Sequence, residues 1–337
     1  MTETVEEINA TYEDLAELER EFEDVETEIS ECSSSWTNGA DGRNPIKNTR
    51  KRKSFSLIPA NMAQVRQQYT LSKPLFEKRE KLVAKIPSFW PLVIEQAPPD
   101  VDQYIQPSDS AVLLSSLKNV SVSHFEIENG SKGDPRSIAI KIEFSDNEYF
   151  EDTVLEKKFW YRRSKDGYAG LVSEPVPIKW KAGKDLTQGL LDLTVKVWEE
   201  DKKQSQANGP SKEKKKVKPE DWTADQKALR EKIDAFGLGG VSFFCWFGYR
   251  GEDISAEESA IAVEEDKKRR AERREGKTPG LKEAEDDDEE DDDEEDPLAL
   301  EIFPDGDDLA VAFSEDLWPS AIKYFSEYLS VSGLHMD

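Results

Sequence analysis

Twelve consecutive acidic residues between Glu285 and Asp296 constrain the fold of this chain more than any other feature. Like charges about 4 Å apart repel by about 1 kcal/mol even in water, so we expect the run to stay extended and solvated. Such a segment cannot enter a core and repels nucleic acid and anionic membranes. It can hold a flexible cationic partner or act as a solubilising spacer. The run consists of Glu285, Asp286, Asp287, Asp288, Glu289, Glu290, Asp291, Asp292, Asp293, Glu294, Glu295 and Asp296.

The net charge of −26 is distributed unevenly along the chain. Residues 252–337 hold 30 acidic and 9 basic side chains, and residues 1–31 hold 13 acidic residues and Arg20 alone. The remaining residues, 32–251, hold 29 acidic and 36 basic side chains, an excess of 7 positive charges. A basic-leaning body between two acidic arms suits a protein that handles both halves of a nucleoprotein.

The sequence also predicts a compartment. Two cysteines make no disulfide framework, which favours a reducing environment. No apolar run approaches the roughly 18 residues that span a bilayer, so we expect no membrane contact. Basic clusters at 50–53, 212–218 and 267–274 resemble nuclear import signals. We therefore predict a nuclear protein, with shuttling to the cytoplasm as the alternative; which cluster acts as the signal stays open.

Two stretches near the N-terminus have the apolar spacing of a coiled-coil helix. Residues 1–31 form an acidic helix whose seam must be covered by a helix of the same chain or of a partner, since exposed apolar side chains are costly. The pattern of residues 65–88 predicts a continuation of this dimerisation helix, in which Pro74 makes a kink or starts a new turn. The predicted dimerisation residues are Ile8, Leu15, Leu18, Phe22, Val25, Ile29, Val65, Tyr69, Phe76, Leu82, Val83 and Ile86.

A Ser/Gly/Asn-rich insert at 32–64 interrupts this helical pattern. Two interpretations stay open: a retained intron translated in frame, and a loop that carries an import signal. Transcript sequencing across codons 30–66 separates them.

The mixture of helical and alternating apolar spacing in residues 89–251 predicts an α+β domain with a four-stranded antiparallel sheet covered by helices. Alternating apolar residues place strands at about 120–124, 138–144, 155–161 and 176–180. A capped helix precedes them at 108–117, and a charged linker at 199–220 separates them from a helix at 225–236 and an apolar core segment at 242–247. A charged helix and the acidic tract occupy 252–308, a helical segment 309–330 completes the domain, and 331–337 form a tail.

No catalytic signature is present. The two histidines, His124 in a strand and His335 near the C-terminus, are far apart in sequence, and neither zinc-ligand spacing nor a phosphate-binding loop occurs. We expect a protein that is not an enzyme and uses no cofactor or metal.

Six collinear segments are similar to the nucleosome assembly protein family, and most closely to its SET / template-activating factor I branch. They are LSKPLFEKR (71–79), IPSFW (86–90), SDNEYFEDTVLEKKF (145–159), IKWKAGKDLT (178–187), SFFCWF (242–247) and EDLWPSAIKYF (315–325). The resemblance implies a homodimer with two α+β "earmuff" domains that bind core histones. It places histone or double-stranded DNA contacts at Lys179, Lys181, Lys184, Asp185 and Thr187.

Three departures from the branch stand out: the acidic tract lies before the last helical segment, a long stretch follows Thr187, and the 32–64 insert breaks a helix. The preferred function is a dimeric histone chaperone that assists nucleosome assembly, disassembly and chromatin remodelling. The alternatives are a regulatory inhibitor or scaffold acting on a phosphatase or histone acetyltransferase, and a carrier of basic cargo such as a ribosomal protein. The choice of histone pair, DNA binding and phosphorylation stay open.

Overall fold

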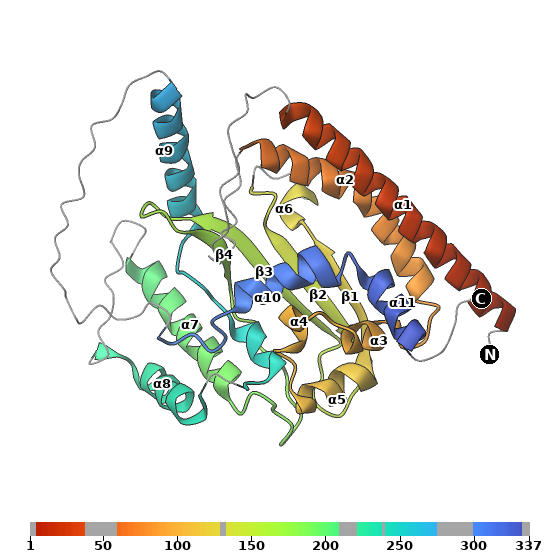
Figure 1. Ribbon diagram of the computed structural model, residues 1–337. Coiled ribbons are helices and arrows are strands. Elements are labelled where there is room, and N and C mark those ends of the chain that lie inside the picture. Colours follow the sequence, from red (N-terminus) through yellow and green to blue (C-terminus); the bar gives the residue numbers. More distant parts are fainter. Residues whose placement is uncertain are drawn as a thin grey trace.

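The computed structural model describes residues 5–37, 59–128, 133–208, 221–237, 240–274 and 299–331. A four-stranded antiparallel sheet is covered by helices, and two long helices lie along one side of the molecule (Figure 1). The predicted α+β class is confirmed. Helices before the sheet are α1 (Val5–Thr37), α2 (Pro59–Val83), α3 (Phe89–Glu95), α4 (Pro99–Asp102) and α5 (Pro107–Ser116).

Helices α1 and α2 form an antiparallel hairpin within one chain (Figure 1). The Phe22 ring lies 4.9 Å from the Phe76 ring, and Lys78 Nζ lies 2.6 Å from a Glu21 carboxylate oxygen. The prediction that residues 65–88 continue the helix of residues 1–31 is therefore wrong. Turning back lets α2 cover the apolar stripe of α1, whose burial stabilises both helices.

The seam residues are consequently covered inside the chain. Leu15, Leu18 and Ile29 are buried, and the Tyr12 ring at the start of α1 lies 6.1 Å from Phe325 of the last helix. Phe22, Val25, Val65, Phe76 and Leu82 are half-buried, and Tyr69, Val83 and Ile86 are buried. The side chain of Ile8 lies outside the described residues.

The predicted insert at 32–64 is helical at both ends, because α1 reaches Thr37 and α2 begins at Pro59. Proline is favoured in the first turn, and Ala60, Met62, Ala63 and Gln64 are good helix formers. Residues 38–58 lie outside the described residues. Helix α2 passes through Pro74 without ending there.

The sheet has the strand order β1-β2-β3-β4 with antiparallel neighbours throughout. The strands are β1 (Leu117–Ser123), β2 (Ile138–Phe144), β3 (Val154–Arg163) and β4 (Ala169–Ser173), with the short helix α6 (Phe125–Glu128) after β1. Ile140 pairs with Val122 on one side and Lys157 on the other. The apolar alternation in the sequence predicted which side chains of β2 and β3 face the core.

The predicted strand at 176–180 is wrong; the fourth strand is β4. Strands β3 and β4 form a hairpin, with Gly167 at a φ of 104° in its turn. Pro175 and Pro177 lack the N–H that a ladder requires, so the segment after β4 forms, among the residues that the structure describes, a single bridge between Trp180 and Phe150. The Asp166-Gly167 pair is the hairpin signal that the sequence contained.

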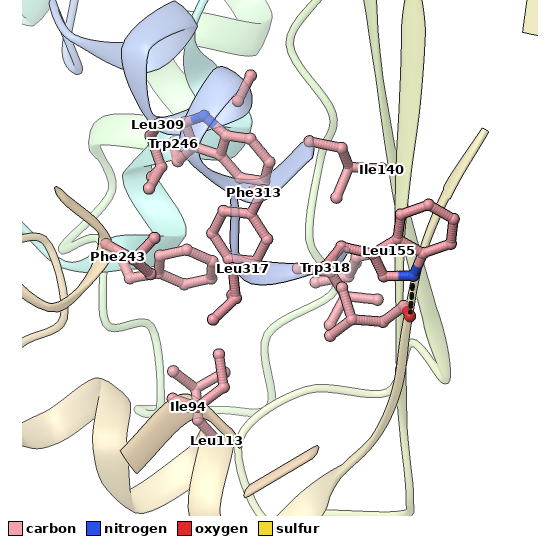
Figure 2. Close-up of a cluster of buried hydrophobic side chains, with 14 of the residues drawn as sticks. Ile94, Leu113, Ile140, Leu155, Phe243, Trp246, Leu309, Phe313, Leu317 and Trp318 are labelled. Carbon is pink, nitrogen blue, oxygen red and sulfur yellow. Dashed lines mark hydrogen bonds between the residues drawn. The ribbon is translucent and has the colours of Figure 1, made fainter. Parts of the chain in front are cut away.

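The buried face of the sheet is covered by segments from distant parts of the chain. They are the 3₁₀ helix Phe243–Gly248, α10 (Gly306–Ala312) and the π-helical turn Phe313–Leu317; the last helix, α11 (Ala321–Val331), packs against α3. The Trp246 ring stacks 5.7 Å from Phe313 and 5.4 Å from Phe159 of β3. Figure 2 shows part of this core, where Trp246, Phe313 and Leu317 cluster with Ile140 of the sheet. The apolar segment 242–247 is core, as its composition predicted.

Helix α7 (Leu190–Asn208) extends into the predicted linker at 199–220, which is therefore wrong over 199–208. Val197 is buried, and Asp201 accepts a hydrogen bond at 3.1 Å from Arg250, so tertiary contacts hold the charged half of the helix. Residues 209–220 lie outside the described residues. Helices α8 (Ala224–Phe236) and α9 (Ala256–Arg274) follow; both begin with reciprocal capping bonds, at Thr223–Gln226 and Ser255–Glu258.

One charged residue lies on the core face of the sheet. Lys157 of β3 is fully buried, and its Nζ donates to the carbonyl oxygens of Glu174 and Phe247 at 3.0 Å and of Tyr249 at 2.9 Å. These bonds tie β3 to the 3₁₀ helix and to the chain after β4. Burial lowers the pKa of Lys157 to about 7, against the attraction of Glu301 and Glu174.

This buried lysine predicts a pH-dependent stability. The unfolded chain keeps the Lys157 proton up to about pH 10, while the folded chain releases it near pH 7, so unfolding takes up a proton between these values. The free energy of unfolding should rise by about 2 kcal/mol between pH 7 and pH 9 through this residue. Urea unfolding of the parent and of Lys157→Met at both pH values measures the contribution, because the variant lacks it. Lys158→Met, at an exposed neighbour, is the control; a parent–variant difference that stays constant with pH contradicts the prediction.

Candidate functional site

Two segments form the surface where the family resemblance predicts partner contacts. Residues 145–153 connect β2 to β3, and residues 178–187 lead towards α7. Asn147 Oδ1 accepts the N–H groups of Tyr149 and Phe150, which turns the first segment outward. The Lys181 N–H then donates to the Tyr149 carbonyl at 2.7 Å, and the Glu151 N–H donates to the Lys179 carbonyl at 2.9 Å. The two segments therefore lie side by side.

The three predicted lysines are on this surface, and each has an acidic partner from the facing segment. Lys184 Nζ lies 2.7 Å from Glu148, Lys181 Nζ lies 3.3 Å from Asp146, and Lys179 Nζ lies 3.8 Å from Asp152. The Lys184–Glu148 hydrogen bond lowers the pKa of Glu148 and raises the pKa of Lys184. These pairs are solvent-exposed, and exposed pairs add little stability. Their main effect is on the electrostatic character of the surface.

The surface is acidic, whereas the sequence reading of its lysines suggested a basic one. Four carboxylates of the 145–153 segment lie opposite three lysines and one further carboxylate of the 178–187 segment, so the two segments together carry a net charge of −2. The carboxylates are Asp146, Glu148, Glu151, Asp152 and Asp185, and the lysines are Lys179, Lys181 and Lys184. Sequence reasoning did not single out Asp146, Glu148 and Asp152, which the structure places against the three lysines.

Asp185 and Thr187 hold a turn of the chain at the edge of this surface. Asp185 Oδ1 accepts the Thr187 N–H at 2.8 Å and its hydroxyl at 2.6 Å, and Oδ2 accepts the Gly189 N–H at 2.6 Å. Thr187 is only 2% exposed, so its side chain cannot contact a partner. The turn that these bonds hold leads directly into α7.

An aromatic cluster holds the surface on the domain. The Trp180 ring lies 5.6 Å from Phe150 and 5.5 Å from Phe244 of the core segment. Both contacts have edge-to-face geometry, which aromatic pairs prefer. The lysines on either side of Trp180 are therefore carried by a rigid base.

Two further acidic features flank this domain. The exposed side chains of α1 between residues 13 and 24 include five carboxylates and one guanidinium: Glu13, Asp14, Glu17, Arg20, Glu23 and Asp24. The predicted acidic tract, Glu285 to Asp296, lies outside the described residues, between the end of α9 and the chain that resumes at Ala299.

Neither a metal site nor a membrane span is found in the part of the chain that the structure describes. No group of three or more His, Cys, Asp or Glu side chains there is placed to hold a metal ion. None of its helices combines the length and the apolarity needed to cross a bilayer.

Comparison with known proteins shows what the chain is similar to. A putative nucleosome assembly protein of Schizosaccharomyces pombe is 37% identical over 133 residues, which cover 36% of this chain and 52% of the relative. Protein SET of Drosophila melanogaster is 35% identical over 139 residues, covering 38% of this chain and 45% of the relative. The chain thus spans about half the length of these curated relatives.

Solved structures include a crystal structure of the Vps75 histone chaperone, with a TM-score of 0.46, 22% identity and coverage of 80% of this chain and 92% of that one. The family model described as "Nucleosome assembly protein (NAP)" matches residues 2–328. This match confirms the resemblance of the six segments, and the chain belongs to the nucleosome assembly protein family.

Proposed function

We propose that this protein is a nuclear histone chaperone, which binds core histones as one or both of their natural pairs. In this role it assists nucleosome assembly and disassembly and the remodelling of chromatin. Membership of the family supports the proposal, as do relatives named as a nucleosome assembly protein and as protein SET. It uses no cofactor, and shuttling to the cytoplasm belongs to the same proposal.

The observation that carries the proposal is the pairing of Lys179, Lys181 and Lys184 with carboxylates. Binding of double-stranded DNA depends on cationic side chains that neutralise phosphates and release counterions. Here each lysine already has a carboxylate within 3.8 Å, and the surface keeps two negative charges in excess. Such a surface favours a partner that carries its own positive charge, as histones do. The three lysines reduce the attraction of this surface for any cation, and they favour a basic partner that also presents carboxylates to pair with them.

The acidic face of α1 and the acidic tract add to this preference. Both present many carboxylates with few cations beside them, and their attraction for a basic partner reaches about 10 Å at 0.1 M ionic strength. We infer that the tract engages flexible lysine- and arginine-rich segments, while the paired surface engages a folded region.

Opposite charge variants of one surface test the proposed partner class. Replacing Asp146, Glu148 and Asp152 by their amides should weaken histone binding roughly three- to tenfold and flatten its salt dependence, since two exposed charges and one half-buried charge are lost. Replacing Lys179, Lys181 and Lys184 by Gln should leave histone binding unchanged or stronger. Fluorescence titration with core histones and with duplex DNA, each at low and moderate salt, measures both effects.

If the lysine variant loses DNA binding and the amide variant keeps full histone binding, the surface faces DNA. If neither variant changes histone binding, a regulatory role or another basic cargo becomes the better proposal.

The acidic tract is tested by deleting Glu285 to Asp296. The deletion removes twelve charges that no core requires, so thermal unfolding should match that of the parent. Histone affinity should fall, and its dependence on salt should flatten, because fewer counterions are released. Equal affinities of parent and variant at both salt concentrations would make the tract a solubilising spacer. Loss of folding would show that the tract supports the helices on either side of it.

We also propose that the chain forms a homodimer. Helix α2 of the same chain covers the apolar stripe of α1, but Phe22, Phe76 and Leu82 stay half-buried, so a second copy can pack on their exposed parts. Light scattering should give twice the chain mass of 38.3 kDa. Replacing Phe22 and Leu82 by Glu should then yield monomers or aggregates. A clean dimer from that double variant rules out the seam as the interface, and a monomeric parent rules out the dimer.

A further inference from the structure

The edge strand β1 has backbone groups that point away from the sheet. The indole Nε1 of Trp318 donates to the Val120 carbonyl oxygen at 3.1 Å, so the carbonyl of Val120 points away from β2. The hydrogen-bonding direction of a strand alternates from residue to residue. The N–H and C=O groups of Val122 therefore point outward as well, together with the N–H of Val120.

The pairing of β2 supports this assignment. The Phe144 N–H donates to the Thr153 carbonyl on the β3 side. Ile140 has the same parity as Phe144, so it also bonds towards β3 and leaves its neighbour Val122 without a ladder bond from β2. Within the described residues, no other hydrogen bond takes up the Val122 backbone groups.

A cavity of about 280 Å³ separates this edge from helix α2. Its wall includes Val120 and Val122 from β1, Phe76 from α2, and Trp90 from α3. Trp90 is 2% exposed, and its indole Nε1 has no hydrogen-bond partner among the described residues. A buried donor without an acceptor costs about 1–3 kcal/mol, so such a group calls for an acceptor from outside the chain.

The charged groups around the cavity favour a cationic occupant. Glu77 and Glu80 of α2 line it with exposed carboxylates. The cations present are already engaged: Lys73 pairs with Glu128 at 2.7 Å, and buried Arg79 donates to the Trp318 carbonyl at 2.5 Å. The exposed rim is therefore negative, while the interior offers hydrogen-bond donors.

We infer that this cavity binds an extended, lysine- or arginine-bearing peptide segment of a partner protein, which adds to the sheet beside β1. One residue of the peptide exchanges two backbone hydrogen bonds with Val122, as opposed residues of paired strands do. A peptide carbonyl accepts the Trp90 indole N–H, and a basic side chain reaches Glu77 or Glu80. The site lies apart from the paired lysine surface, so it is a second contact beyond the proposed function.

The free edge is short, which limits the peptide to a few residues. At one end of the edge, the Trp318 indole already donates to the Val120 carbonyl. At the other end lies Tyr69, whose ring is 4.8 Å from the His124 ring. At about 3.3 Å per residue, the stretch between these two points accepts two or three peptide residues. Specificity then comes from the alternate side chains that flank the bonded residue.

The probe is the acetylated and amidated peptide Thr-Lys-Val-Lys-Val-Lys-Thr with a fluorescent label. Because lysine and valine alternate, a shift of the peptide by one residue along β1 moves its lysines from one face of the sheet to the other. Its analogue with every backbone nitrogen methylated keeps the charge but has no N–H to donate. The acidic residues 285–296 attract both peptides equally through charge, so a comparison of the two on the full chain isolates backbone pairing. We expect the parent peptide to bind about three- to tenfold more tightly than the analogue, because the analogue cannot donate a hydrogen bond to the Val122 carbonyl and its methyl groups crowd the strand edge.

Protein variants locate the binding. Trp90→Phe keeps the ring but removes the donor, and it should weaken the parent peptide about three- to tenfold. The analogue should be affected less, because its methyl groups prevent it from lying beside β1. Its thermal stability should equal or exceed that of the parent, since an unsatisfied buried donor is gone. Glu77→Gln should weaken both peptides slightly, whereas Glu231→Gln, on the exposed face of α8, should not.

The indole N–H resonance of Trp90 gives a direct readout, and it should shift when the parent peptide is added. Equal binding of the two peptides overturns the strand pairing. An unchanged ratio of their affinities in Trp90→Phe shows that an ordered water satisfies the indole and overturns the cavity as the binding site.

Discussion

The apolar face of the four-stranded sheet must be covered, and the rest of the molecule depends on how this is achieved. The cover comes from the 3₁₀ helix at 243–248 and from the segment 306–318, which lie far from the strands in sequence. Polar bonds hold these pieces in place: Asp109 of α5 accepts the Phe243 N–H at 2.7 Å, and Trp246 donates to the Gly306 carbonyl at 2.8 Å. Because each bond is buried, a shift of one piece would leave several polar groups without partners.

The same cover links the helical hairpin to the sheet. Buried Arg79 of α2 donates to the Trp318 carbonyl, and its guanidinium lies 4.9 Å from the Trp318 ring. Trp318 in turn donates to the edge strand at Val120. Burial lowers the pKa of Arg79 to about 9, so the guanidinium stays charged at neutral pH. One aromatic residue therefore joins α2, the C-terminal segment and β1, and it also defines the cavity beside that strand.

Several elements could be read directly from local patterns. The alternation of Ile138, Ile140 and Ile142 predicted β2, and the Ser255–Glu258 capping box predicted the start of α9. The unbroken apolar segment 242–247 was recognisable as core. Where local signals were mixed, the prediction failed: Val176 and Ile178 alternate like a strand, but the prolines beside Val176 cannot donate to a ladder. The charged half of α7 resembled a linker because its stabilising partner, Arg250, is remote in sequence.

The sequence by itself determined the class of the fold, the family, the acidic character of both arms and the positions of Lys179, Lys181 and Lys184. These properties follow from composition, periodicity and motifs, which are local. Only the tertiary structure decided that α1 folds back on α2, that buried Lys157 donates hydrogen bonds to three carbonyl oxygens, and that each surface lysine pairs with a carboxylate. Such features depend on contacts between residues distant in the chain, and a periodic pattern shows that a side chain must be covered without showing which segment covers it.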